Sequence, residues 1–216
     1  MLGFLQDLLQ RLYALHVPYD VGEFVITDAR LARLLDDSPT ARETPEKLLV
    51  RQDGDCVDLS LYLDAAVVER LERDSPEQGL HAGNIDDFCI ALEGVSHFLY
   101  LAWNAGKDRS VRLLELELQA EVDKYAAIAT LLRLQAGGRI PAWLRRWLFD
   151  NARFDPRLAP EEHARYRDAN HFAARYCRHL ERRFSWRWNS LASIRELRHF
   201  YRLSQPAKIS HITACA

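Results

Sequence analysis

The sequence predicts a mainly α-helical (α+β) fold: a helical bundle with a small antiparallel β-hairpin, or a three-stranded sheet, near its N-terminus. Two observations carry this prediction. Apolar residues recur at helical spacing almost without interruption after residue 64. Before that point the segment VDLSLYL alternates polar and apolar residues, as expected for a strand with one buried face. A hydrophobic fraction of 48% with 28% charged residues is ordinary for a folded globular protein.

The N-terminal elements follow in order. Leucines at helical spacing predict a helix over 2–15, and Pro18 prevents it from continuing. Residues 19–27 read as extended chain and could supply a third strand. Asp28 is suited to cap a short helix that ends at Leu35, and a loop rich in Ser, Pro and Thr follows it.

A β-hairpin is the clearest β signal. The apolar run KLLVRQ is separated from VDLSLYL by Asp53-Gly54-Asp55, and Asp-Gly between two apolar runs is typical of a hairpin turn. The sequence beyond it predicts helices with a break at Gly137-Gly138 and Pro141 and a mobile or interacting tail after Pro206. The predicted helices are 64–73, 84–104, 109–135, 140–151, 159–184 and 190–203.

Charge is distributed unevenly along the chain. We interpret residues 1–216 as one domain, with an acidic α/β sub-region over about 1–80 and a helical remainder. Residues 1–163 carry 18 basic against 28 acidic side chains, whereas 164–216 carry 11 against 3. This charge-polarised pattern fits two oppositely charged regions that attract each other within one fold. An acidic or nucleic-acid ligand is the alternative.

Several classes of protein are not expected. No apolar run reaches the length of a membrane-spanning helix, and the N-terminal segment has neither a basic region nor a cleavage site of a signal peptide. We therefore expect a cytoplasmic protein. Four cysteines form no CxxC pair and no Cys/His ligand spacing, so reduced thiols are expected and a structural zinc site is not. These are Cys56, Cys89, Cys177 and Cys215.

Four side chains on the two central helices form a candidate metal site. Glu93 and Glu121 each lie 14 residues from Lys107, the centre of the intervening turn, and His97 and Glu117 each lie 10 residues from it. An antiparallel helix pair would bring them level with one another. Carboxylates and imidazole suit a divalent ion such as iron or manganese.

A purely structural interpretation of these acids competes with the metal site. Lys124, together with arginines from the basic C-terminal region, could neutralise Glu117 and Glu121, with His97 hydrogen-bonded to Glu117. The Glu-x-x-His motif of di-iron bundles is missing, since Glu93 and His97 are four residues apart.

The basic C-terminal region is a candidate binding surface for a protein partner or for nucleic acid. Arginines crowd the helix predicted over 159–184, and aromatic rings follow in the segment FSWRW. Rings beside guanidinium groups can stack on bases or on the side chains of a partner. The candidate residues are Arg178, Arg182, Arg183, Trp186, Arg187 and Trp188.

Motifs for nucleotide binding, proteolysis and common hydrolases are missing from the sequence. The leading hypothesis is a helical interaction or regulatory protein that binds another protein or a second copy of itself. One alternative is a metal-binding helical protein or metal-dependent enzyme that uses Glu93, His97, Glu117 and Glu121. Nucleic-acid binding through the basic, aromatic C-terminal region is the other.

Overall fold

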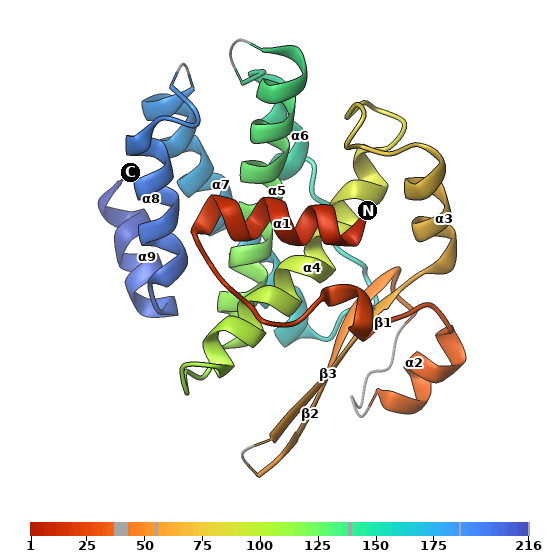
Figure 1. The fold of residues 1–216 in the computed structure, drawn as a ribbon. Coiled ribbons are helices and arrows are strands. Elements are labelled where there is room, and N and C mark those ends of the chain that lie inside the picture. The colour runs from red at the N-terminus through yellow and green to blue at the C-terminus, as the bar shows by residue number, and fades with distance from the viewer. Residues whose placement is uncertain (37–42, 55, 138–139, 186, 216) are drawn as a thin grey trace. The chain divides into compact units, whose positions relative to one another are not determined.

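The computed structural model describes all residues except 37–42, 55, 138–139, 186 and 216 (Figure 1). The described residues are mainly helical with one small three-stranded sheet, which confirms the predicted fold class. The chain divides into two compact units. The first unit comprises residues 1–10 and 16–109, and the second comprises 11–15 and 110–216. Among the described residues, no helix is both long and apolar enough to cross a bilayer.

The sheet of the first unit contains the predicted hairpin. Strand β2 (Glu46–Asp53) pairs antiparallel with β3 (Cys56–Leu63), while β1 (Val25–Ile26) pairs parallel with β3, giving the order β1-β3-β2. Gly54 adopts a φ of 58°, which the hairpin turn requires and which glycine adopts without steric cost. Asp55, the third residue of the predicted turn, lies outside the described residues.

The strand expected over 19–27 is largely a helical turn. Only Val25–Ile26 pairs with the sheet, because Val21–Phe24 forms a 3-10 helix, η1. The Asp20 side chain accepts a hydrogen bond from the Gly22 amide at 2.8 Å. Gln6 accepts one from the Val21 amide, also at 2.8 Å. These side chains satisfy amides that a strand would have paired.

Helices pack on this sheet within the first unit. The first ten residues contribute most of α1 (Leu2–Tyr13), and α2 (Ala29–Leu35) begins at Asp28, whose carboxylate accepts from the Arg30 amide as predicted. The remaining helices are α3 (Ala65–Arg73) and α4 (Ile85–Ala105), which are packed against each other. Arg70 of α3 donates two hydrogen bonds to Asp87 of α4, at 2.6 and 2.7 Å.

Gly94 allows α4 to approach the sheet closely. A Cβ atom at this position would lie 2.7 Å from Leu61 Cδ1 and 2.9 Å from Glu46 Cγ. We expect Gly94→Val to lower the free energy of unfolding by about 1–3 kcal/mol, because the added carbons overpack this contact. Urea denaturation measures the loss. Gly3→Val is the control, since no heavy atom lies within 4 Å of that Cβ position, and equal losses in the two variants would contradict the prediction.

In its described residues, the second unit is built from five further helices and the end of α1. The long helices α5 and α7 pack against each other, α6 packs on both, and α9 packs on α7. In Figure 1, α8 and α9 run side by side. The bounds are α5 (Leu113–Ala136), α6 (Trp143–Phe149), α7 (Pro160–Phe184), α8 (Leu191–Arg202) and α9 (Gln205–Ala214). Gly138, part of the predicted break before α6, lies outside the described residues.

Helix α9 shows that the predicted mobile tail was wrong. Residues 205–214 are helical, and the side chains of Lys208 and Ile212 are buried. Pro206 stands in the first turn of this helix, where its missing N–H needs no partner. Pro206, after which a mobile or interacting tail was predicted, therefore lies in the first turn of a helix.

Two arginines of α8 bind the end of α1 within the second unit. Arg198 donates to the carbonyls of Arg11 and Leu12, at 3.1 and 3.0 Å. Arg202 donates to those of Tyr13 and Ala14, at 3.0 and 3.2 Å. Guanidinium groups donate hydrogen bonds to the carbonyls that a helix end leaves unpaired. Their positive charge also interacts favourably with the partial negative charge at the C-terminal end of the helix. The basic C-terminal region thus binds backbone carbonyl groups of the N-terminal segment.

A polar network lies in the core of the second unit. Gln119 accepts a hydrogen bond from the ammonium group of Lys208 and donates one to Asp123 at 2.7 Å. Asp123 also accepts from the hydroxyl of Tyr13, and all four side chains are buried. Burial, followed by the neighbouring Asp123 carboxylate, raises the pKa of Tyr13 well above its usual value. The amide of Gln119 therefore presents its oxygen to a cation and its NH2 group to an anion.

Candidate metal centre

Glu93 and His97 lie four residues apart on α4, in the first unit. Helical geometry places side chains with this spacing one turn apart on the same side of the helix. His97 is buried and Glu93 is half-buried. The spacing recognised in the sequence therefore lies within a regular helix, as predicted.

His97 has a carboxylate partner in the first unit that the sequence did not suggest. Its Nδ1 atom lies 3.3 Å from Oε1 of Glu46, and the two side chains are only 7% and 13% exposed. With a proton on Nδ1, the ring donates to this carboxylate and Nε2 carries the lone pair. Metal-binding histidines commonly hold one ring N–H on a carboxylate in this way, which fixes the tautomer and the ring orientation.

The hairpin positions Glu46. This residue begins β2 and pairs with Leu63, two positions from the pair Leu48 and Leu61. Residues paired across an antiparallel ladder, and those two apart along a strand, share one face. That face approaches Gly94 of α4. Glu46 is thus an acid on an otherwise leucine-rich face, and this pattern was the sequence signal that could have identified it.

Glu117 and Glu121 lie on α5, in the second unit, and both have basic partners there. Arg165 Nε of α7 is 3.5 Å from a carboxylate oxygen of Glu117, and Lys124 Nζ is 2.8 Å from one of Glu121. The neutralisation of these acids by Lys124 and by an arginine of the C-terminal region is confirmed. The predicted hydrogen bond between His97 and Glu117 stays a prediction.

Two of the four predicted ligands lie together in the first unit. Glu93 and His97 are among the described side chains that could hold a metal ion. Glu117 and Glu121 belong to the second unit, where the carboxylate of Glu121 pairs with Lys124. The involvement of all four residues stays a prediction.

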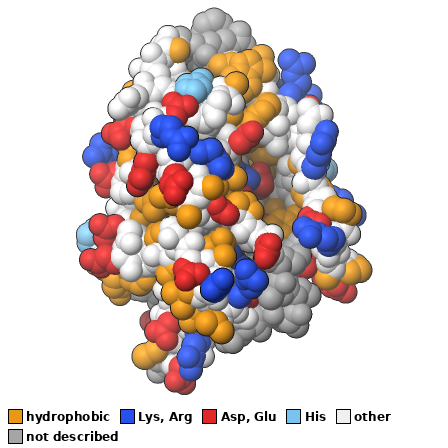
Figure 2. Space-filling view, turned by 90° about the vertical axis from the view of Figure 1, so that its right-hand side faces the viewer, with side chains coloured by type: hydrophobic (Ala, Val, Ile, Leu, Met, Phe, Trp, Pro, Cys, Tyr) orange, Lys and Arg blue, Asp and Glu red, His pale blue; other side chains and the backbone are white. Residues whose placement is uncertain are grey.

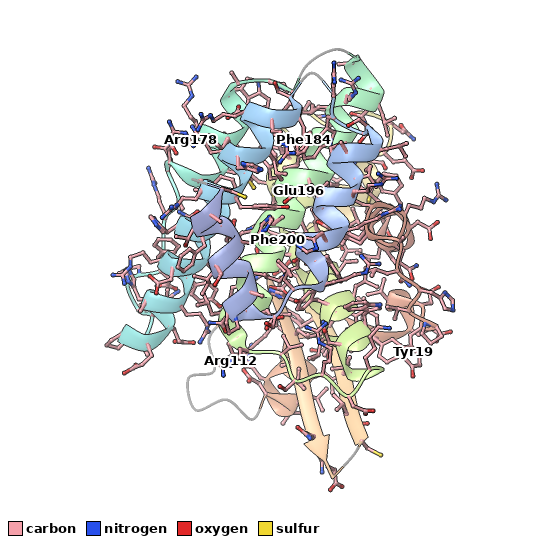
Figure 3. All side chains as sticks on the ribbon, turned by 90° about the vertical axis from the view of Figure 1, so that its left-hand side faces the viewer. Tyr19, Arg112, Arg178, Phe184, Glu196 and Phe200 are labelled. Atoms are coloured by element: carbon pink, nitrogen blue, oxygen red, sulfur yellow. The ribbon has the colours of Figure 1, made fainter. Side chains whose placement is uncertain are left out.

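The basic surface predicted near the end of α7 is partly present. Arg178, Arg182, Arg183 and Arg187 are exposed, and Figure 3 shows Arg178 on the outer side of α7. Trp186 lies outside the described residues. On the face drawn in Figure 2, by contrast, Lys and Arg side chains are interspersed with Asp and Glu. Opposite charges are therefore mixed on that face.

Trp188 differs from its predicted role. Its side chain is 2% exposed and packs edge-on against Tyr125, with 5.7 Å between ring centroids. Its indole N–H donates to Thr130 Oγ1 at 3.1 Å. The alternating pattern of FSWRW suggested exposed rings, but this ring belongs to the core of the second unit. In this conformation it is not available to stack on a base or on a partner.

Comparison of the chain with protein-family models, with curated proteins and with solved structures found no match.

Proposed function

We propose that the protein binds a divalent metal ion through Glu93 and His97 of α4. The observation that carries this proposal is the contact between Glu46 and Nδ1 of His97. A proton on Nδ1 of His97 would be donated to Glu46, which would orient the ring and leave Nε2 as the coordinating atom. Glu46 is then the residue that positions His97.

The chemistry of the donors indicates which ions are suited. A carboxylate and an imidazole are hard to borderline ligands, which manganese, iron and zinc accept in helical proteins. Two protein ligands leave further coordination positions for water. A bound ion lowers the pKa of such a water and so supplies a nucleophile.

Metal content tests the proposal. We expect protein purified without chelators to contain at least one equivalent of iron, manganese or zinc by elemental mass spectrometry. Replacing both Glu93 and His97 with Gln should lower the metal content by one equivalent. Glu46→Gln should keep the ligands but weaken affinity by about 10–100-fold, because it loosens the orientation of the ring.

Two control variants sharpen this experiment. Glu121→Gln removes an acid paired with Lys124 and should leave the metal content unchanged, as should His171→Gln at an exposed histidine. Circular dichroism verifies that each variant is folded. A metal-free wild-type protein that remains unloaded after incubation with each of the three ions would overturn the proposal.

Protein binding, the leading hypothesis from the sequence, remains a second proposal. The observation that favours it is a pair of tryptophans on α6. Trp143 and Trp147 are 45% and 38% exposed and pack edge-to-face, with 6.4 Å between ring centroids. Exposed tryptophans are enriched among the residues that contribute most to binding at protein interfaces.

A further inference from the structure

A second group of metal-binding side chain types lies within the second unit, where α7, α8 and α9 meet. His211 Nε2 lies 2.7 Å from a carboxylate oxygen of Glu196 and 3.8 Å from the sulfur of Cys215. His179 of α7 lies beside the Cys215 backbone, and its Nε2 is buried without a hydrogen-bond partner. Figure 3 shows Glu196 on α8, on the face of the second unit that it draws.

The helices account for this arrangement. His211 and Cys215 are four residues apart at the end of α9, so both project from the same side. Glu196 is held from α7 by the hydroxyl of Tyr176, which donates to it at 3.2 Å. The ring of Tyr176 in turn stacks on Phe200, with 3.9 Å between centroids. The sequence did not reveal the spacing of His211 and Cys215, because α9 was expected to be a mobile tail.

We propose that Cys215, His211 and Glu196 bind Zn²⁺, with His179 as the fourth ligand. Sulfur, imidazole nitrogen and carboxylate oxygen are the donors that zinc prefers, and four of them complete a tetrahedral site. In a tetrahedral site, zinc lies about 2.3 Å from a sulfur ligand and about 2.0 Å from a nitrogen ligand. The sulfur and nitrogen atoms are then about 3.5 Å apart. The observed separation between Cys215 and His211 is 3.8 Å.

Occupation of this site requires the ligand atoms to move closer together and one proton to leave, because among the described residues this set is not one whose ligand atoms all lie within 4.8 Å of one another. The distance of 2.7 Å between His211 and Glu196 would open to about 3.3 Å when both bind the ion. Burial, with Glu196 acting in the same direction, raises the pKa of the Cys215 thiol, so the metal-free side chain is protonated. Zn²⁺ displaces this proton to solvent, and thiolate and carboxylate together balance the charge of the ion. Arg183 is the nearby charge that opposes the cation.

Cobalt(II) is the probe that identifies a thiolate ligand. We expect reduced, metal-free protein titrated with Co²⁺ to develop thiolate-to-cobalt charge-transfer absorption and the visible bands of tetrahedral cobalt, and Zn²⁺ to displace both. Cys215→Ser should abolish the charge-transfer absorption and weaken Zn²⁺ binding by more than about 100-fold, since even residues that only orient ligands alter affinity by 10–100-fold. Cys56→Ser, at an exposed cysteine in the first unit, should retain both signals.

Two further measurements separate this site from the one on α4. The variant with Gln at positions 93 and 97 should keep the thiolate absorption. The two proposed sites are therefore tested independently of each other. In unaltered protein, Zn²⁺ should slow alkylation of Cys215 as read by peptide mass spectrometry, which requires no variant to fold. Cobalt bands without thiolate character, thiolate absorption that persists in Cys215→Ser, or alkylation that Zn²⁺ does not slow would overturn the proposal.

Discussion

Replacing Trp188 with alanine is expected to lower the free energy of unfolding by about 3–5 kcal/mol, the cost of removing a fully buried large aromatic side chain. The side chain is 2% exposed and contacts Tyr125 edge-on. Its loss creates a cavity in the second unit and leaves Thr130 without the indole N–H that it accepts. Equilibrium denaturation by urea, followed by circular dichroism, measures the change.

Two controls test whether burial accounts for the loss at Trp188. Trp143→Ala removes a tryptophan that is 45% exposed, and it should change stability by no more than about 0.5 kcal/mol. Thr130→Val removes the acceptor of the indole N–H together with the hydrogen bond that the same hydroxyl donates to the Ala126 carbonyl, and it should cost about 1–3 kcal/mol. Similar losses for the two alanine variants would show that Trp188 is not part of the core.

Substitutions in the buried network of Lys208, Gln119 and Asp123 are expected to cause the second large loss of stability. Lys208→Met removes the buried ammonium group that donates to Gln119, and Asp123→Asn removes the buried carboxylate that accepts from Gln119 and Tyr13. We expect each change to cost about 3–5 kcal/mol, because removing one member of a buried charged network is strongly destabilising. Urea denaturation measures each loss, as it does for Trp188.

The double variant of Lys208 and Asp123 tests whether the two charges are coupled. Because it removes both charges together, its loss should be smaller than the sum of the single losses by about 1–3 kcal/mol. Gln119 joins the two groups by accepting from one and donating to the other. Additive losses would mean that this amide does not couple them.

Most of the secondary structure followed from local patterns in the sequence. The leucine spacing at the N-terminus, the Asp28 cap and the alternation in VDLSLYL each predicted an element that the structure contains. These signals involve residues only a few positions apart. The prediction failed for α9, because a proline that follows one helix and a proline in the first turn of the next have the same sequence context.

The candidate metal site was only partly predictable. The spacing of Glu93 and His97 was visible because both lie on one helix. Glu46 was missed because it is 51 residues from His97 and meets it only through the packing of α4 on the sheet. The prediction that Trp188 is exposed failed for a related reason. Its partners Tyr125 and Thr130 lie on α5, far away in the sequence. No local pattern distinguishes a buried ring of this kind from an exposed one.

The binding of the α1 carbonyls by Arg198 and Arg202 has a consequence for synthesis on the ribosome. These contacts span 186 to 189 residues. At about 5–20 residues per second, the carbonyls of residues 11–14 wait roughly 10–40 s for their guanidinium partners to be translated. During that interval these contacts cannot form, whereas every residue of the first unit has been translated once residue 109 is made. The second unit is therefore completed late, although one of its segments is among the first to be translated.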